Sequence, residues 1–206
     1  MTPAGSRNTR SSHMKNQFTP LYRIWHWTMA LSVIGLLCTV LLRKTFLSYK
    51  TNALIIQEKL AALDIEITLE SAKAIAKAIR APMWEWHYIF AAVLGISILL
   101  RLVLIFTKET KHPIVQFLEA PKGEKLKKGV HALLCLCIAL LALSGALLYF
   151  HETLGLEKAS IGWVKESHEF LMFPLIGMIV LHLGGVLMHE ITTKEGIVSK
   201  MIHGDS

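Results

Sequence analysis

Cysteine is scarce in this chain of 206 residues, and no cysteine motif is present. The sequence C-x-x-C-H does not occur, which excludes a covalently attached c-type haem. Motifs for flavin, nicotinamide or iron–sulfur cofactors are also absent, so we expect the chain to catalyse little alone. Cys135 and Cys137 are two residues apart and point to different faces of a helix. We interpret both, together with Cys38, as small apolar packing residues.

Acidic residues are few. There are 15 Asp and Glu against 22 Lys and Arg, which gives a net charge of +7 and a pI of about 9.4. In a soluble protein this excess would suggest nucleic-acid binding. Here the basic residues flank long apolar blocks, hydrophobic residues make up 53% of the chain, and the mean hydropathy is +0.47. Membrane topology and lipid headgroups therefore explain the charge, and we expect no nucleic-acid partner.

Four apolar blocks lie at about 24–42, 83–106, 130–150 and 168–189. Each is close to the ~20 residues that a helix needs to cross ~30 Å of hydrocarbon. Helices are required there because no water is present to satisfy a broken backbone. The pattern predicts an all-α integral membrane four-helix bundle, formed by one domain over 22–204 after a polar arm at 1–21. The first thirteen residues are patternless and precede Met14, a candidate natural start, so they are left out of the fold argument.

Lysine and arginine in the short loops predict the orientation of the helices. Six lie in 107–129 and only two in 151–167, while four more precede the first block or lie at its start. This bias places both termini and the 107–129 loop in the cytoplasm, in a multi-pass protein of the bacterial inner membrane. The segment 43–82 opposes the bias with seven basic residues, although four acidic residues accompany them.

Two short helices are predicted between the first two blocks, at about 52–63 and 68–80. Thr68 is a suitable N-cap, apolar residues recur at helical spacing after it, and Pro82 ends the second helix. One interpretation is a periplasmic helical hairpin that lies on the bundle or on the membrane surface. The other is a platform on which a periplasmic partner docks.

Seven of the ten histidines lie in or beside the apolar blocks: His26, His87, His131, His151, His168, His182 and His189. Ionisable residues inside a membrane are costly and usually functional. A single histidine can also simply hydrogen-bond between helices, so the depths of the histidines are needed to distinguish the two roles.

His168 and His182 are fourteen residues apart. In a helix this is a rise of ~21 Å and a rotation of ~1400°, about 40° short of four full turns. The two side chains therefore share a helix face, one near each membrane surface, with Pro174 able to bend the helix between them. Because successive spans run in opposite directions, His26 matches His182 in depth on the cytoplasmic side, and His87 matches His168 on the periplasmic side. Two imidazoles on facing helices at one depth are what a six-coordinate b-type haem requires.

Three further residues have candidate roles beside such haems. Arg23 lies one turn before His26, and Arg101 lies fourteen residues after His87 at the cytoplasmic level. Both are candidate partners for haem propionates, although Arg101 could instead extend its side chain to the membrane surface. His131 could hydrogen-bond a propionate, form part of a quinone pocket or replace a ligand.

Two alternatives concern the cytoplasmic end of the last block. His189 lies two turns beyond His182 on nearly the same face, so it is an alternative ligand, and we prefer His182 for its depth. Lys127 and Lys128, with His131, are a candidate quinone or partner site. We interpret His151 as interfacial.

The chain from about Tyr22 to Gly204 resembles the bacterial di-haem cytochrome b-561 family, which includes the b-type subunit of nickel–iron hydrogenases. The resemblance rests on four patterns: Arg23-x-x-His26-Trp27-x-x-Ala30, His87 followed by Arg101, His168-x13-His182, and Met201-x-x-Gly204. The chain departs from the family at Ala91, where a glycine is common, and in its long 43–82 segment.

The resemblance implies four transmembrane helices and two b haems, with His26, His87, His168 and His182 as axial ligands. It also implies electron exchange with the quinone pool and a partner redox protein of hydrogenase, dehydrogenase or cytochrome c type. The chain would then act as a free-standing electron-transfer cytochrome or as the membrane subunit of a larger oxidoreductase.

Two other hypotheses belong to different classes. A membrane transporter could bind zinc or copper through the histidines, but a zinc site wants three or four ligands converging on one point, and these histidines are split between two levels. The chain could also be a plain membrane anchor, with the histidines used for packing.

Overall fold

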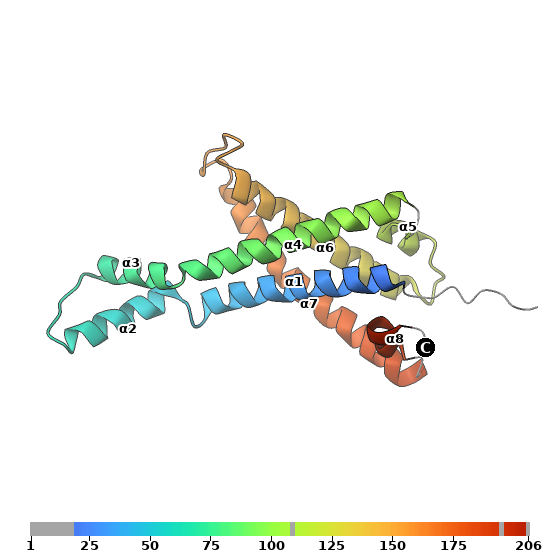
Figure 1. The fold of residues 1–206 in the computed structure, drawn as a ribbon, viewed down its shortest axis with the longest axis horizontal. Helices are drawn as coiled ribbons and strands as arrows, with labels where there is room; N and C mark the ends of the chain where they lie inside the picture. Colours follow the sequence, from blue (N-terminus) through green and yellow to red (C-terminus); the bar gives the residue numbers. More distant parts are fainter. Residues whose placement is uncertain (1–18, 108–109, 194–195, 205–206) are drawn as a thin grey trace, which may run out of the picture.

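The computed structural model describes residues 19–107, 110–193 and 196–204, and the regular structure in these ranges is entirely helical. The polar arm predicted for 1–21 therefore falls largely outside the described residues. The helices, in chain order, are α1 (Pro20–Lys44), α2 (Tyr49–Ala61), α3 (Leu69–Ile79), α4 (Ala81–Phe106), α5 (Pro113–Leu118), α6 (Lys125–Phe150), α7 (Gly162–Thr193) and α8 (Ile197–His203) (Figure 1).

The helices α1, α4, α6 and α7 are long and apolar enough to cross a membrane. This confirms the prediction of an all-α protein with four transmembrane helices. The helices extend beyond the apolar blocks, because polar ends continue the same helix into the headgroup region. Large apolar side chains on each of the four helices face outward, at exposures that a water-soluble surface rarely carries: Leu31 61%, Ile96 66%, Leu143 69% and Val180 63%.

Local sequence signals explain where α1 begins and ends. The Thr19 hydroxyl accepts a hydrogen bond from the Tyr22 amide, and proline occupies the first helical position, where its missing N–H costs nothing. Arg43 and Lys44 lie in the last turn, next to the carbonyl end of the helix dipole.

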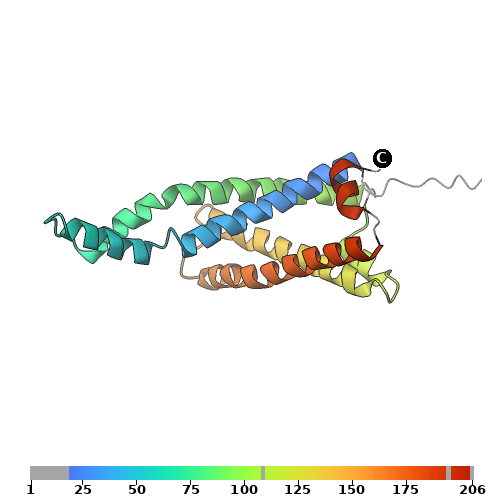
Figure 2. The same cartoon turned by 90° about the horizontal axis from the view of Figure 1, so that it is seen from below.

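The four long helices associate as two pairs, α1 with α4 and α6 with α7 (Figure 2). One apolar cluster joins the pairs at mid-height and takes a side chain from every long helix: Val33, Leu94, Cys137, Ile138 and Leu175. Cys137 is thus a core packing residue, as predicted. Cys38 is exposed on α1, so its prediction as a packing residue within the protein was wrong.

The segment between α1 and α4 is a helical hairpin of α2 and α3, closed by three alanines that are almost fully buried: Ala53, Ala72 and Ala76. Small side chains there let the two helix backbones approach closely. The hairpin extends beyond the ends of α6 and α7 in line with α1 and α4, rather than lying on the bundle (Figures 1 and 2). The start of α1, α5 and α8 lie at the opposite end.

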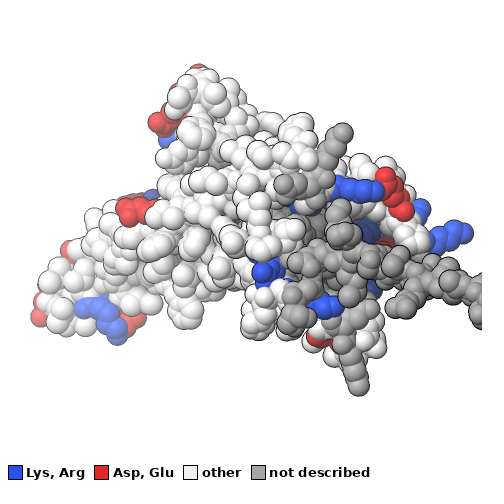
Figure 3. All heavy atoms as spheres, turned by 45° about the vertical axis from the view of Figure 1, so that its right-hand side comes forward, with Lys and Arg blue, Asp and Glu red and all other residues white. Residues whose placement is uncertain are grey.

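Charge is distributed along the same long axis. On the face in Figure 3, charged side chains gather at the hairpin, at the turn between α6 and α7, and at the end that carries α5 and α8. The stretch between these groups is largely uncharged. The end of the bundle next to α2 and α3 is called the hairpin side below, and the end that carries α5, α8 and the start of α1 is called the α8 side.

The contact between α1 and α4 depends on Gly35, where an added Cβ would lie 2.7 Å from the Phe90 ring. We expect Gly35→Leu to separate the two helices and to destabilise the protein by about 1–3 kcal/mol, the usual cost of overpacking. Thermal unfolding of the purified protein in detergent measures the effect. Gly177→Leu is the control, because Gly177 is exposed on α7 and has nothing within 4 Å of its Cβ position. Equal unfolding temperatures for the two variants would contradict a close α1–α4 contact.

Candidate functional site

The hairpin-side level contains His87 of α4 and His168 of α7, each held by a hydroxyl from the other helix of its pair. His87 Nδ1 lies 2.8 Å from Thr39 Oγ1 of α1. His168 Nδ1 lies 2.8 Å from Ser144 Oγ of α6. Because Nδ1 of each ring is engaged in this way, Nε2 is the nitrogen left for a further partner. The two rings are close enough to interact electrostatically, as their predicted depths require.

The α8-side level brings three histidines together. The ring centroids of His26 and His182 are 6.5 Å apart, and those of His131 and His182 are 6.4 Å apart. With metal–nitrogen bonds of about 2.0–2.1 Å and roughly 1.1 Å from nitrogen to centroid, two axial imidazoles have centroids about 6.3 Å apart. The spacing of both pairs therefore fits one metal ion between two rings.

Hydrogen bonding distinguishes the two rings that flank His182. His131 Nε2 lies 3.7 Å from Cys135 Sγ, one turn along the same helix. Among the hydrogen bonds of the described residues, none uses a ring nitrogen of His26 or His182. His131 thus already has a partner within its own helix, whereas His26 and His182 come from two different helix pairs and face each other without one.

Arg101 is buried between the helices on the α8 side, with an exposure of 9%. Its guanidinium lies 4.7 Å from the Trp25 ring centroid and 5.7 Å from that of Tyr22. Trp25 is fixed in turn by its indole N–H, which donates to the Ser97 carbonyl at 2.8 Å. This position between the helices favours a role inside the bundle for Arg101.

Two arginine nitrogens on this side are buried without a hydrogen-bond partner, Nη1 of Arg101 and Nε of Arg23. A buried cationic donor without an acceptor is costly, and a carboxylate is its strongest partner. Together with the paired histidines, these donors fit a haem with anionic propionates. The sequence analysis had predicted this role for the same two arginines.

The end of the chain fixes Arg23 in position. Arg23 Nη1 donates to the Ile202 carbonyl at 3.3 Å, and Trp27 Nε1 donates to the Met201 carbonyl at 3.1 Å. Gly204 has a φ of +94°, and an added Cβ would lie 2.8 Å from Arg23 Nη1. The R-x-x-H-W and M-x-x-G patterns are therefore two halves of one contact between α1 and α8.

The sequence analysis missed Arg43 as a site residue and used it only for topology. Its guanidinium lies 5.4 Å from the Trp84 ring centroid, 3.7 Å from Glu169 and within electrostatic range of His87. Arg43 could have been found from the sequence, because it lies at the end of the first span, at the depth predicted for His87. Arg43 is the cation of the hairpin-side level, as Arg101 is of the α8 side.

The remaining candidates lie at the edges of the two levels. Lys127 Nζ is 3.3 Å from His189 Nδ1, so His189 is turned toward α6, and His182 is the ring beside His26. Lys128 is within electrostatic range of His131, which groups Lys127, Lys128, His131 and His189 near the start of α6.

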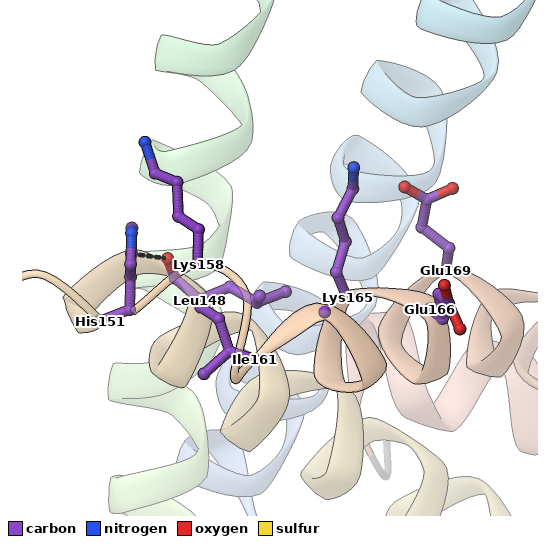
Figure 4. A pocket seen from close by; sticks show the side chains of 8 residues that line it. Leu148, His151, Lys158, Ile161, Lys165, Glu166 and Glu169 are labelled. Atoms are coloured by element: carbon purple, nitrogen blue, oxygen red, sulfur yellow. Dashed lines mark hydrogen bonds between the residues drawn. The ribbon is translucent and has the colours of Figure 1, made fainter. Parts of the chain in front are cut away.

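A cavity of about 740 Å³ opens on the hairpin side, where α6 turns into α7. Figure 4 shows His151, Lys158 and Lys165 around it together with two carboxylates, Glu166 and Glu169. His151 Nδ1–H donates to the Leu148 carbonyl at 2.9 Å, and its location at the membrane interface stays a prediction.

A transporter site of the kind considered from the sequence would need at least three converging ligands. Within residues 19–107, 110–193 and 196–204, no group of three or more His, Cys, Asp or Glu side chains could hold a metal ion. The histidines of the described residues lie at two levels instead, on the hairpin side and on the α8 side.

Comparison with known proteins identifies a family. The model of the family described as prokaryotic cytochrome b561 matches residues 17–204. Searches of curated proteins and of solved structures gave no match. The family match covers nearly the whole chain, including all four candidate spans. The chain therefore belongs to the prokaryotic cytochrome b561 family, as a membrane b-type cytochrome of electron transport.

Proposed function

We propose that this chain binds two b haems, one between His26 and His182 on the α8 side and one between His87 and His168 on the hairpin side. The observation that carries the proposal is the pairing of histidines from opposite helix pairs at two depths. The 6.5 Å spacing of the His26 and His182 rings supports the first assignment. The hydroxyls that engage Nδ1 of His87 and His168 support the second.

The protein residues around these positions have separable tasks. The histidines fix the iron positions, and the apolar cluster between the two levels, Val33, Leu94, Ile138 and Leu175 among its members, excludes water from the bundle interior. Arg101 and Arg23 offer unpartnered nitrogens to propionates on the α8 side, and Arg43 offers its guanidinium on the hairpin side. Haem b, when bound, supplies one-electron redox chemistry whose potential depends on its ligands and on burial.

We further propose that electrons pass across the bacterial inner membrane between the quinone pool and a partner redox protein of hydrogenase, dehydrogenase or cytochrome c type. The two proposed haem levels lie toward opposite ends of the spans, which suits transfer from one face to the other. Lys127, Lys128 and His131 are the proposed quinone or partner site on the α8 side. The projecting hairpin is the proposed contact for a periplasmic partner.

The haem content of histidine variants tests the ligand pairs. Purified protein should show about two haems per chain, and dithionite-reduced minus oxidised spectra should show a b-type band. His26→Ala should remove only the α8-side haem and His87→Ala only the hairpin-side haem, because each change deletes one axial ligand. His189→Ala and His131→Ala are the controls and should each retain both haems. Loss of both haems or of neither in the ligand variants would contradict the pairing.

Reporter fusions test the orientation. A phosphatase that is active only outside the cytoplasm, inserted between α2 and α3, should be active, because the positive bias of the other loops places the hairpin outside. The same reporter inserted between α5 and α6 should be inactive, and a fluorescent protein fused after α8 should fluoresce. The reverse pattern would contradict the proposed topology and would exchange the two faces in the scheme above.

A further inference from the structure

The two hydroxyls of the hairpin-side level are arranged alike, although they come from unrelated positions in the chain. Thr39 is 6% exposed on α1, and its Oγ1 donates to the Leu36 carbonyl at 2.7 Å. Ser144 lies on α6, and its Oγ donates to the Leu140 carbonyl at 2.7 Å. Each oxygen also lies 2.8 Å from the Nδ1 atom of a histidine on the neighbouring helix.

This arrangement favours one tautomer of each histidine. A hydroxyl group has one proton and two lone pairs. Thr39 Oγ1 and Ser144 Oγ each lie 2.7 Å from a main-chain carbonyl, which can only accept. Both contacts of each hydroxyl are therefore satisfied at once when the hydroxyl donates to the carbonyl and the histidine Nδ1–H donates to the hydroxyl. The neutral ring then carries no proton on Nε2, which is the form that binds a metal ion. The hydrogen bonds around both hairpin-side histidines thus favour the ligand tautomer.

A second contact restricts the His168 ring. Gly145 follows Ser144, and an added Cβ would lie 3.1 Å from His168 Cε1. The ring is therefore bounded by the serine hydroxyl on one side and by the glycine backbone on another. The α8 side differs, because no hydroxyl engages His26 or His182 among the described residues.

We propose that Thr39 and Ser144 are positioning residues that orient the hairpin-side histidines and lower the midpoint potential of the haem they ligate. The proposal rests on the proposed ligation by His87 and His168. A ligand imidazole that donates its other N–H is a stronger donor to the metal, and stronger donation favours ferric over ferrous iron. Because the α8-side histidines have no such hydroxyls among the described residues, the two hydroxyls lower the midpoint potential of the hairpin-side haem only.

Potentiometric titration of hydroxyl variants tests this role. Thr39→Val and Ser144→Ala remove the acceptors at nearly constant shape. Each should raise the midpoint potential of the hairpin-side haem, by about a tenfold change in the ferric–ferrous equilibrium, which is ~59 mV for one electron. The α8-side haem should keep its potential. Thr39→Ser and Ser144→Thr retain a hydroxyl and should restore the wild-type value.

Ser32→Ala is the matched control. Ser32 is a buried α1 residue, 2% exposed, whose hydroxyl donates to the Thr28 carbonyl at 2.8 Å but contacts no histidine. It should leave both potentials unchanged. Loss of only the hairpin-side haem in Thr39→Val would also support the positioning role. The midpoint potential of that haem would then be measured in Ser144→Ala alone.

The outcomes separate the two proposals. Unchanged potentials in Thr39→Val and Ser144→Ala, with two haems still bound, would overturn the positioning role and leave the ligand assignment standing. An equal shift in Ser32→Ala would overturn it as well, because the effect would then be one of packing. Two haems retained in His87→Ala would instead overturn the ligand assignment itself.

Discussion

A histidine ring in hydrocarbon needs partners for its nitrogens, because an unpaired polar group there costs several kcal/mol. This requirement organises the bundle. The α1–α4 pair contributes His87 together with the hydroxyl of Thr39, and the α6–α7 pair contributes His168 together with the hydroxyl of Ser144. Each helix pair thus satisfies one nitrogen of its own histidine from within the pair. What remains for the contact between pairs is the opposite nitrogen, and this explains why the candidate ligands lie between the pairs and not on the lipid face.

The same principle accounts for the charged groups inside the protein. Arg101 is stacked on Trp25, which is anchored to the Ser97 carbonyl of α4. Arg43 has an aromatic ring and a carboxylate beside it. These guanidiniums lie at opposite ends of the bundle, one near each histidine level. They differ in one respect that bears on function, since Arg43 has an anionic partner in the chain whereas Arg101 retains a buried nitrogen without any acceptor. The two levels are therefore electrostatically unequal.

Much of the fold could be predicted from the sequence, because apolar blocks near 20 residues long leave few alternatives in a membrane. The four spans and the family were predicted and are confirmed, and Thr68 does cap α3. The depth argument anticipated that His26 and His182 lie together, although their role as ligands stays a prediction. It did not anticipate Thr39, Ser144 or Arg43, because these contacts depend on how two helices are rotated against each other. The outward position of Cys38 was missed for the same reason. Hydropathy does not distinguish a side chain that faces lipid from one that packs against another helix.

The contact between the two ends of the chain has a consequence for assembly. Arg23 and Trp27 belong to the first helix to be synthesised, yet their carbonyl partners at Met201 and Ile202 belong to the last. The hairpin-side level, by contrast, needs nothing beyond the first turns of α7. During synthesis the hairpin-side level can therefore be completed first, while the α8 side closes only once α8 has left the ribosome and folded back on α1. The order of residues along the chain thus imposes an order of maturation on the two ends of the bundle, and a truncated product would be left open at one end only.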